Sequence, residues 1–263
     1  MPNWSDPAEI VRDAGIFQKF CLALLGVSTW EVFAQLPFDY SMVTGQRKAR
    51  WPLIIYLYCK YSLWFAVIGV NVALNVTSKV DCQSLYVFNQ FAGNTAIGSA
   101  STLLMLRTIA IWSHKHAITI PLVVLSLGQW AILFHVKSSW SEVSHACVVT
   151  GTKPAFIDLI YLYTMSFDFV VMVASVVGLL YTGGRSSLWI LLFKQGVVYF
   201  VVAFTANLIP AVFLLLDLNP IMNIMFTIPA ATATSIVACR SFVSLTDYKS
   251  TEVYVQCVLC HLS

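Results

Sequence analysis

The sequence predicts an all-α fold, a polytopic membrane bundle of seven transmembrane helices, and three observations support it. Of the 263 residues, 59% are hydrophobic and only 10% are charged, whereas soluble domains have about 45–50% apolar and about 25% charged residues. The apolar residues form long blocks, and a helix of about 20 apolar residues crosses a bilayer. Short polar connections separate the blocks. We therefore expect one transmembrane domain, residues 1–248, followed by a short cytosolic tail, residues 249–263.

The apolar blocks place each span in order along the chain. The first span follows a helix start at Asp6-Pro7, because Asp suits a cap and Pro suits the first turn. The third combines apolar residues with a polar face, and the sixth and seventh carry Pro210 and Pro229, which predict kinks. The expected spans are residues 16–38, 51–73, 85–112, 117–136, 156–182, 188–216 and 220–239.

Basic residues set the expected direction of the chain. Most of them fall on the side that holds the loops after the first, third and fifth spans and the C-terminus, and cytosolic loops are rich in Lys and Arg. The N-terminus is therefore expected outside and the C-terminus in the cytosol, in a plasma or secretory-pathway membrane. Two N-glycosylation sequons, at Asn3 and Asn75, fall on the predicted outer side. The basic residues on the predicted cytosolic side are Arg47, Lys48, Arg50, Arg107, Lys115, Arg185, Lys194, Arg240 and Lys249.

Cysteines at two places indicate covalent modification. Only Cys82 and Cys147, among seven cysteines, lie in predicted outer loops, where an oxidising compartment permits a disulfide. We expect them to pair, and the alternative is two unpaired loop thiols. At the C-terminus, Cys260 begins a segment with the length of a prenylation box, and Cys257 is a palmitoylation candidate. The alternative there is an ordinary cytosolic tail.

Two charged residues inside the first two spans are expected to pair. Glu31 lies about seven residues above the cytosolic end of its span, and Lys60 about nine residues above the same surface. Their depths therefore differ by roughly 3 Å. Because buried charges in lipid occur as pairs or mark function, we predict a Glu31–Lys60 ion pair. A packing lock is favoured over a catalytic or proton-relay role.

A third ionisable residue, Asp168, lies near the midplane of the fifth span without a basic partner at its depth. It is expected to be neutral or to accept hydrogen bonds from amides. Asn207 of the sixth span lies at a similar depth. On the third span, Gln90, Asn94 and Ser101 share one face, because their spacing follows the helical repeat.

These five polar residues allow two interpretations. They either form hydrogen bonds between helices, as small and polar residues do in membrane bundles, or line a polar cavity that opens outward. No spacing typical of a metal site is present, and neither a cofactor nor a metal is expected. The net charge of +3 and the lack of a basic cluster also exclude a nucleic-acid partner.

Several motifs between Trp30 and Tyr248 are distinctive. They are Trp30-Glu31 followed by Phe38-Asp39-Tyr40, Asp81-Cys82-Gln83, Ser99-Ala100-Ser101, Leu106-Arg107-Thr108-Ile109-Ala110-Ile111-Trp112, Lys194-Gln195-Gly196, Pro210-Ala211-Val212-Phe213, Asn223-Ile224-Met225-Phe226 and Ala238-Cys239-Arg240-Ser241-Phe242-Val243-Ser244-Leu245-Thr246-Asp247-Tyr248. Together they resemble a large family of multi-pass membrane proteins from mushroom-forming fungi. The resemblance implies the fold and a membrane location, and it implies no particular chemistry.

Three functions fit these expectations. A receptor-like sensor fits the seven spans, the outer N-terminus and a disulfide at the third span, although Arg107 and the seventh span lack the motifs of G-protein-coupled receptors. A small intramembrane enzyme of the terpene-cyclase type would use Glu31 and Asp168 as protonated acids. A transporter or structural protein is the third, and the absence of a repeat speaks against transport. The expected partners are membrane lipids and a small apolar or amphipathic ligand.

Overall fold

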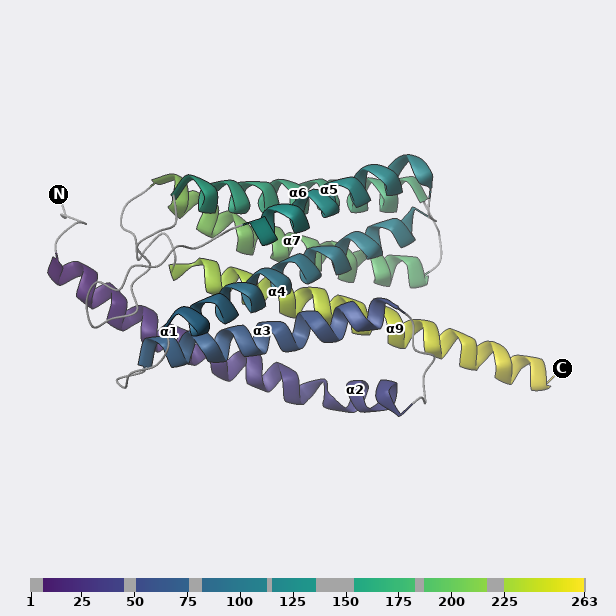
Figure 1. Cartoon of the computed structure of the whole chain (residues 1–263). Coiled ribbons are helices and arrows are strands. Elements are labelled where there is room, and N and C mark those ends of the chain that lie inside the picture. Colours follow the sequence, from purple (N-terminus) through teal and green to yellow (C-terminus); the bar gives the residue numbers. More distant parts are fainter. Residues whose placement is uncertain are drawn as a thin grey trace.

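The computed structural model describes residues 7–44, 51–75, 82–112, 115–135, 154–182, 187–216 and 225–262, and within these ranges the chain is helical apart from short turns. Figure 1 shows long helices packed side by side, with α9 continuing beyond the others toward the C-terminus. The helices are α1 (Pro7–Ala34), α2 (Leu36–Val43), α3 (Pro52–Asn75), α4 (Cys82–Ile111), α5 (His116–His135), α6 (Pro154–Thr182), α7 (Ser187–Leu216) and α9 (Thr227–Leu262).

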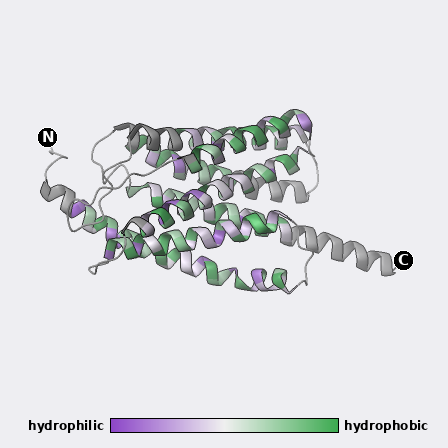
Figure 2. Cartoon of the chain, in the orientation of Figure 1, coloured by the Kyte–Doolittle hydropathy of each residue, from purple (hydrophilic) through white to green (hydrophobic). Residues whose placement is uncertain are grey.

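Five of these helices are long and apolar enough to cross a membrane. Figure 2 shows hydrophobic residues along the length of the bundle. Large apolar side chains also lie on its surface, such as Leu127, which is 64% exposed, and Val177, which is 47% exposed. A soluble protein rarely leaves so much apolar surface in water, so lipid covers it and the chain is a multi-pass membrane protein. The five candidate spans are Arg12–Ala34, Pro52–Asn75, His116–Phe134, Leu162–Tyr181 and Thr227–Thr246.

Helix α4 lies at the centre of the bundle, in contact with α3, α5, α6 and α9. Its polar side chains at Thr95, Ser99 and Ser101 are each 1% exposed, so they face other helices and not lipid. This explains why a helix of 30 residues, about 45 Å long, has a lower mean hydropathy than α3, α5 and α6. Polar residues that point inward do not prevent a helix from lying in a bilayer.

The chain bends between α1 and α2. We expected one uninterrupted span over residues 16–38, but α1 ends at Ala34 and α2 begins at Leu36. Pro37 has no N–H to donate to Phe33, so one helical hydrogen bond is missing at the bend. The backbone bonds from Gln35 to Glu31 and from Asp39 to Gln35 are kept. The bend leaves Asp39 buried and facing α3.

Gly178 permits a close approach between α4 and α6. A Cβ atom added at Gly178 would lie 2.5 Å from Nε1 of Trp112, which donates a hydrogen bond of 2.9 Å to the carbonyl of Ala174. We expect Gly178→Ala to displace the indole ring and to lower the stability by about 1–3 kcal/mol. Thermal unfolding of the purified protein in detergent measures this loss.

The matched control for that substitution is Gly26→Ala in α1. Outside the adjoining backbone of its own helix, no atom lies within 4 Å of a Cβ added at Gly26, so the change should be neutral or slightly stabilising, because Ala favours a helix over Gly. Equal unfolding temperatures for the two variants would contradict the close α4–α6 contact.

Candidate functional site

Asp168 forms the centre of a buried polar cluster. The residue lies on α6 and is 4% exposed. Its Oδ1 accepts a hydrogen bond of 2.8 Å from Oγ of Ser101 on α4, and its Oδ2 accepts one of 2.7 Å from Nδ2 of Asn207 on α7. Two further side chains extend the cluster, because Gln129 of α5 donates to Ser101 over 3.3 Å and Thr234 of α9 donates to Asn207 over 3.4 Å. The Asp168 cluster, defined by these five residues, therefore joins α4, α5, α6, α7 and α9.

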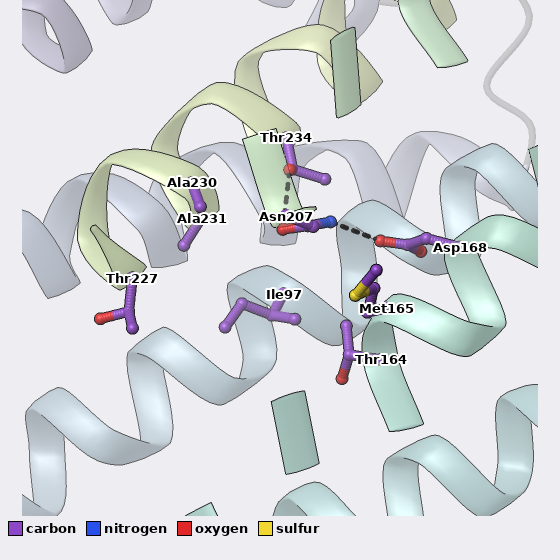
Figure 3. A pocket seen from close by; sticks show the side chains of 9 residues that line it. All are labelled: Ile97, Thr164, Met165, Asp168, Asn207, Thr227, Ala230, Ala231 and Thr234. Carbon is purple, nitrogen blue, oxygen red and sulfur yellow. Dashed lines mark hydrogen bonds between the residues drawn. The ribbon is translucent and has the colours of Figure 1, made fainter. Parts of the chain in front are cut away.

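A small cavity borders this cluster. Figure 3 shows Asn207 lying between Thr234 and Asp168, with apolar side chains and two further threonines around the remaining space. The cavity has a volume of about 20 Å³, which is room for about one water molecule. It is lined by Ile97, Thr164, Met165, Asp168, Asn207, Thr227, Ala230, Ala231 and Thr234.

The electrostatic setting of Asp168 is unusual for a buried carboxylate. Both of its oxygen atoms accept hydrogen bonds from neutral donors. Two buried acids of the described residues have a cationic partner, Asp39 with Lys60 and Glu31 with Arg240. Asp168 belongs to neither of these salt bridges. A buried negative charge is costly unless a cation or a proton balances it. The balancing charge for Asp168 is therefore not supplied by a described Lys or Arg.

The structure brings together three of the five residues predicted to share a cavity. Ser101, Asp168 and Asn207 are hydrogen-bonded, and the last two line the cavity. Asn94 instead donates to the carbonyl of Leu133 on α5 over 2.8 Å, and neither it nor Gln90 is among the lining residues. The reason is direction, because the Asn94 side chain faces α5, whereas Ile97, three residues further along α4, faces the cavity.

Sequence reasoning missed the contribution of α9 to this site. Thr227, Ala231 and Thr234 line the cavity, and their spacing of four and three residues places them on one face of a helix. That pattern is visible in the sequence. It carries little chemical signal, however, because Thr and Ala are common in helix contacts within membranes.

A second polar cluster lies between α1, α2, α3 and α9, and it corrects the predicted Glu31–Lys60 pair. Glu31 is paired with Arg240 of α9, which donates from Nε to Oε1 over 2.8 Å and from its terminal nitrogen to Oε2 over 2.6 Å. Lys60 is paired with Asp39 of α2 over 2.5 Å. Matched depth placed Glu31 and Lys60 at the same level but did not determine their neighbours, so the predicted pairing was wrong.

Hydrogen bonds join these two ion pairs into one chain of side chains. Gln35 donates to Glu31, and the hydroxyl group of Tyr56 lies 2.7 Å from Oε1 of Gln35 and 2.8 Å from Oδ1 of Asp39. Tyr61 also donates to Asp39, over 3.2 Å. We call Glu31, Gln35, Asp39, Tyr56, Lys60 and Arg240 the charge cluster. Unlike Asp168, both carboxylates in it have a cationic partner.

Helix α9 connects the two clusters. Its Thr234 belongs to the Asp168 cluster and its Arg240 to the charge cluster, six residues further on. The next residue, Ser241, accepts a hydrogen bond from Arg107 of α4, and the Arg107 guanidinium lies 6.0 Å from the ring centre of Tyr199 on α7. Residues 240 and 241 are thus held to α1, α4 and, through Arg107, α7.

The predicted covalent modifications lie mostly outside the described part of the chain. Cys147 and Asn3 fall outside the described residues, as do the side chains of Cys82, Cys257 and Cys260. Asn75 is described, as the last residue of α3. Its Oδ1 accepts a hydrogen bond of 2.6 Å from Gln18 of α1. Neither the disulfide, nor glycosylation, nor lipidation is tested by these positions.

Comparisons with protein-family models, with curated proteins and with solved structures found no match. The geometry of the two clusters is therefore the basis for assigning a function.

Proposed function

We propose that the protein is a receptor-like membrane sensor in which the Asp168 cluster is the sensing centre. One observation carries this proposal: a carboxylate without a described Lys or Arg partner lies beside a cavity and is hydrogen-bonded to α4 and α7. An ionisable residue within a membrane is a functional site by default. Any species that binds Asp168 with a donor or a positive charge competes with the hydrogen bonds that join these helices. Binding is thereby coupled to helix position.

The proposal includes seven spans with the N-terminus outside. Five of the seven spans are the apolar candidate helices. The other two are α4 and α7, each of 30 residues, which is long enough to cross a bilayer of about 30 Å. The inward-facing polar residues of α4 support its place as a span. Lys115 and Arg240 lie toward the end of the bundle where α3 begins, and the excess of Lys and Arg at that end supports a cytosolic location.

The ligand proposed for this centre is small and amphipathic. The cavity lining combines apolar Ile97, Met165 and Ala231 with the carboxylate of Asp168 and the amide of Asn207. An apolar pocket with a few polar groups fixes the orientation of a ligand through those groups. A ligand of this kind would place its polar end at Asp168 and displace Asn207. The hydrogen bond from α7 to α6 would be lost, and the link from Asn207 to Thr234 of α9 would change with it.

The charge cluster provides the fixed part of the sensor. The ion pairs Glu31–Arg240 and Lys60–Asp39 hold α9 and α3 to α1 and α2. Breaking the buried Lys60–Asp39 pair costs about 3–5 kcal/mol, whereas a single neutral hydrogen bond contributes about 0.5–1.5 kcal/mol. When the Asp168 cluster rearranges, the weaker contacts on the side of α6 and α7 therefore yield first. The expected motion is a shift of α6 and α7 relative to α2 and α3.

A spin-label experiment tests this motion without knowledge of the ligand. Labels at Val43 and Leu180, which are 77% and 65% exposed, report the distance between α2 and α6 in a background without other reactive cysteines. We expect Asp168→Ala to release the cluster and to shift or broaden the distance distribution by about 2 Å or more. Ser166→Ala is the control, because that exposed residue of α6 bonds only within its own helix. The same distribution in Asp168→Ala and in the parent protein would contradict a sensor and favour a static structural bundle.

The structure gives less support to an intramembrane enzyme. Both oxygen atoms of Glu31 accept hydrogen bonds from Arg240, and Asp39 is paired with Lys60. Both carboxylates are thus already bound to cationic side chains, whereas a catalytic acid needs an oxygen atom that can hold and donate a proton to a substrate.

A further inference from the structure

We propose that the Asp168 cluster is a binding site for one monovalent metal cation of the alkali series. The inference rests on the proposed function in that it names an occupant of the same centre. It stands on three observations: the charge of Asp168, the kind of atoms around it, and the size of the space beside it.

An ionised Asp168 requires a positive partner of one unit of charge. Asp168 is buried and, among the described residues, its hydrogen-bond partners are the neutral Ser101 and Asn207. An ionised carboxylate with neutral partners leaves one negative charge within the bilayer, which costs several kcal/mol. One monovalent cation cancels that charge. A divalent cation would leave one positive charge in its place, and the described part of the chain has no group of three or more His, Cys, Asp or Glu that could hold a metal ion.

The atoms around this point suit a hard cation. Of the residues that line the cavity, Asp168, Thr164, Thr227 and Thr234 carry oxygen as their only polar element, and Asn207 carries an amide oxygen. Hard cations such as alkali and alkaline-earth ions bind oxygen ligands from carboxylates, hydroxyl groups, amides and water. Among the residues that line the cavity, Met165 is the one that carries sulfur. A half-turn of the Asn207 amide, whose oxygen and nitrogen ends have nearly the same shape, presents its oxygen to the ion.

The cavity provides the space. Its volume of about 20 Å³ accepts about one water-sized species, and Asp168 and Asn207 both line it (Figure 3). An ion at this position contacts residues of α4, α6, α7 and α9 at the same time. The cation therefore stabilises the arrangement in which these helices are joined. An amphipathic ligand with a positive head competes with it for Asp168.

Thermal unfolding of the full chain in detergent tests the site with the cations alone. The protein is measured in choline chloride and in the chlorides of lithium, sodium and potassium, at one ionic strength, and each series is run at neutral and at acidic pH. We expect at least one alkali cation to raise the unfolding temperature above that in choline, with saturation. At a concentration about one hundred times its Kd the rise should be about 5–10 °C.

Variants separate this site from general salt effects. Asp168→Asn should abolish the difference between the alkali cation and choline, and Ser101→Ala, which keeps the carboxylate, should move half-saturation to a several-fold higher concentration. Ser166→Ala should behave like the parent protein. If Asp168→Asn does not fold, Ser101→Ala carries the comparison, because it removes the hydroxyl group that is bonded to Oδ1 of Asp168 and leaves the charge.

Three outcomes would overturn the proposal. The first is an equal unfolding temperature in choline and in every alkali chloride. The second is an alkali-cation effect that is unchanged in both Asp168→Asn and Ser101→Ala. The third is stabilisation on acidification alone, equal in all four salts, which would place a proton on Asp168. If alkali cations stabilise the protein but Asp168→Ala does not change the spin-label distance, the ion site is supported and the sensor is contradicted. If Asp168→Ala changes the distance but no alkali cation stabilises the protein, the sensor is supported and the ion site is contradicted.

Discussion

Replacing Lys60 with Met is expected to destabilise the protein by about 3–5 kcal/mol, because it leaves the Asp39 carboxylate buried without a cation. The two side chains are 3% and 7% exposed and their charged atoms lie 2.5 Å apart. Met has a similar length, so packing against Tyr56 and Tyr61 is largely kept. The loss therefore reports the charge and not the volume. Thermal unfolding in detergent should show a fall of about 6–20 °C in the unfolding temperature, at about 2–4 °C for each kcal/mol.

A double-mutant cycle identifies the partner of Lys60. Asp39→Asn removes the opposite charge, so Lys60→Met combined with Asp39→Asn should cost much less than the sum of the single changes. Combined with Glu31→Gln, Lys60→Met should be more nearly additive, because Glu31 is paired with Arg240. Strong coupling of Lys60 to Glu31 and none to Asp39 would restore the pairing that matched depth predicted and contradict the geometry.

The membrane class of the fold could be predicted because it depends on the amount and order of apolar residues. Five predicted spans overlap helices that are long and apolar enough to cross a bilayer, although the last candidate span is Thr227–Thr246 and not residues 220–239. The central position of α4 was not evident, because its polar face indicated either a cavity or helix contacts. Burial decides this point, since Thr95, Ser99 and Ser101 are almost fully inside the bundle. The number of spans and the direction of the chain stay predictions.

The partners in the charge cluster could be predicted only in part. Glu31, Gln35 and Asp39 are each four residues apart, a spacing that predicts one polar stripe on a helix. The stripe was overlooked because Asp39 lies beyond the expected end of the first span. Arg240 was assigned to the cytosolic surface, although a long Arg side chain reaches back along its helix. Which distant helix faces that stripe depends on the packing of the whole bundle, and local sequence does not determine it.

For Asp168, in contrast, the sequence predicts that the residue forms a polar site, and it predicts some of the neighbouring residues. A lone carboxylate at mid-span predicts a polar site whatever the packing. The partnership with Asn207 followed from similar depth on consecutive spans. Similar depth is a sound guide when one candidate is present at that level, as for Asn207. It fails when two acids and two cations lie at similar levels, as for Glu31, Asp39, Lys60 and Arg240.

Tyr56 is expected to be the single most important side chain of the charge cluster. It is 0% exposed, its ring stacks on Phe242 of α9 with centres 5.2 Å apart, and it meets Phe38 of α2 edge-on at 5.7 Å. Its hydroxyl group lies between Gln35 and Asp39. Tyr56→Ala should therefore remove both the contact of α3 with α2 and α9 and the donor, and cost about 3–5 kcal/mol.

Tyr56→Phe separates the two contributions. Phe keeps the ring contacts with Phe38 and Phe242 and removes only the hydroxyl group, so that Gln35 and Asp39 lose a hydrogen-bond partner. The expected cost is about 1–3 kcal/mol, the penalty for buried polar groups left without a partner. Unfolding temperatures of the parent protein, Tyr56→Phe and Tyr56→Ala should fall in that order. If Tyr56→Phe is as stable as the parent protein, the hydroxyl group does not join the two ion pairs, and Glu31–Arg240 and Lys60–Asp39 act as independent contacts.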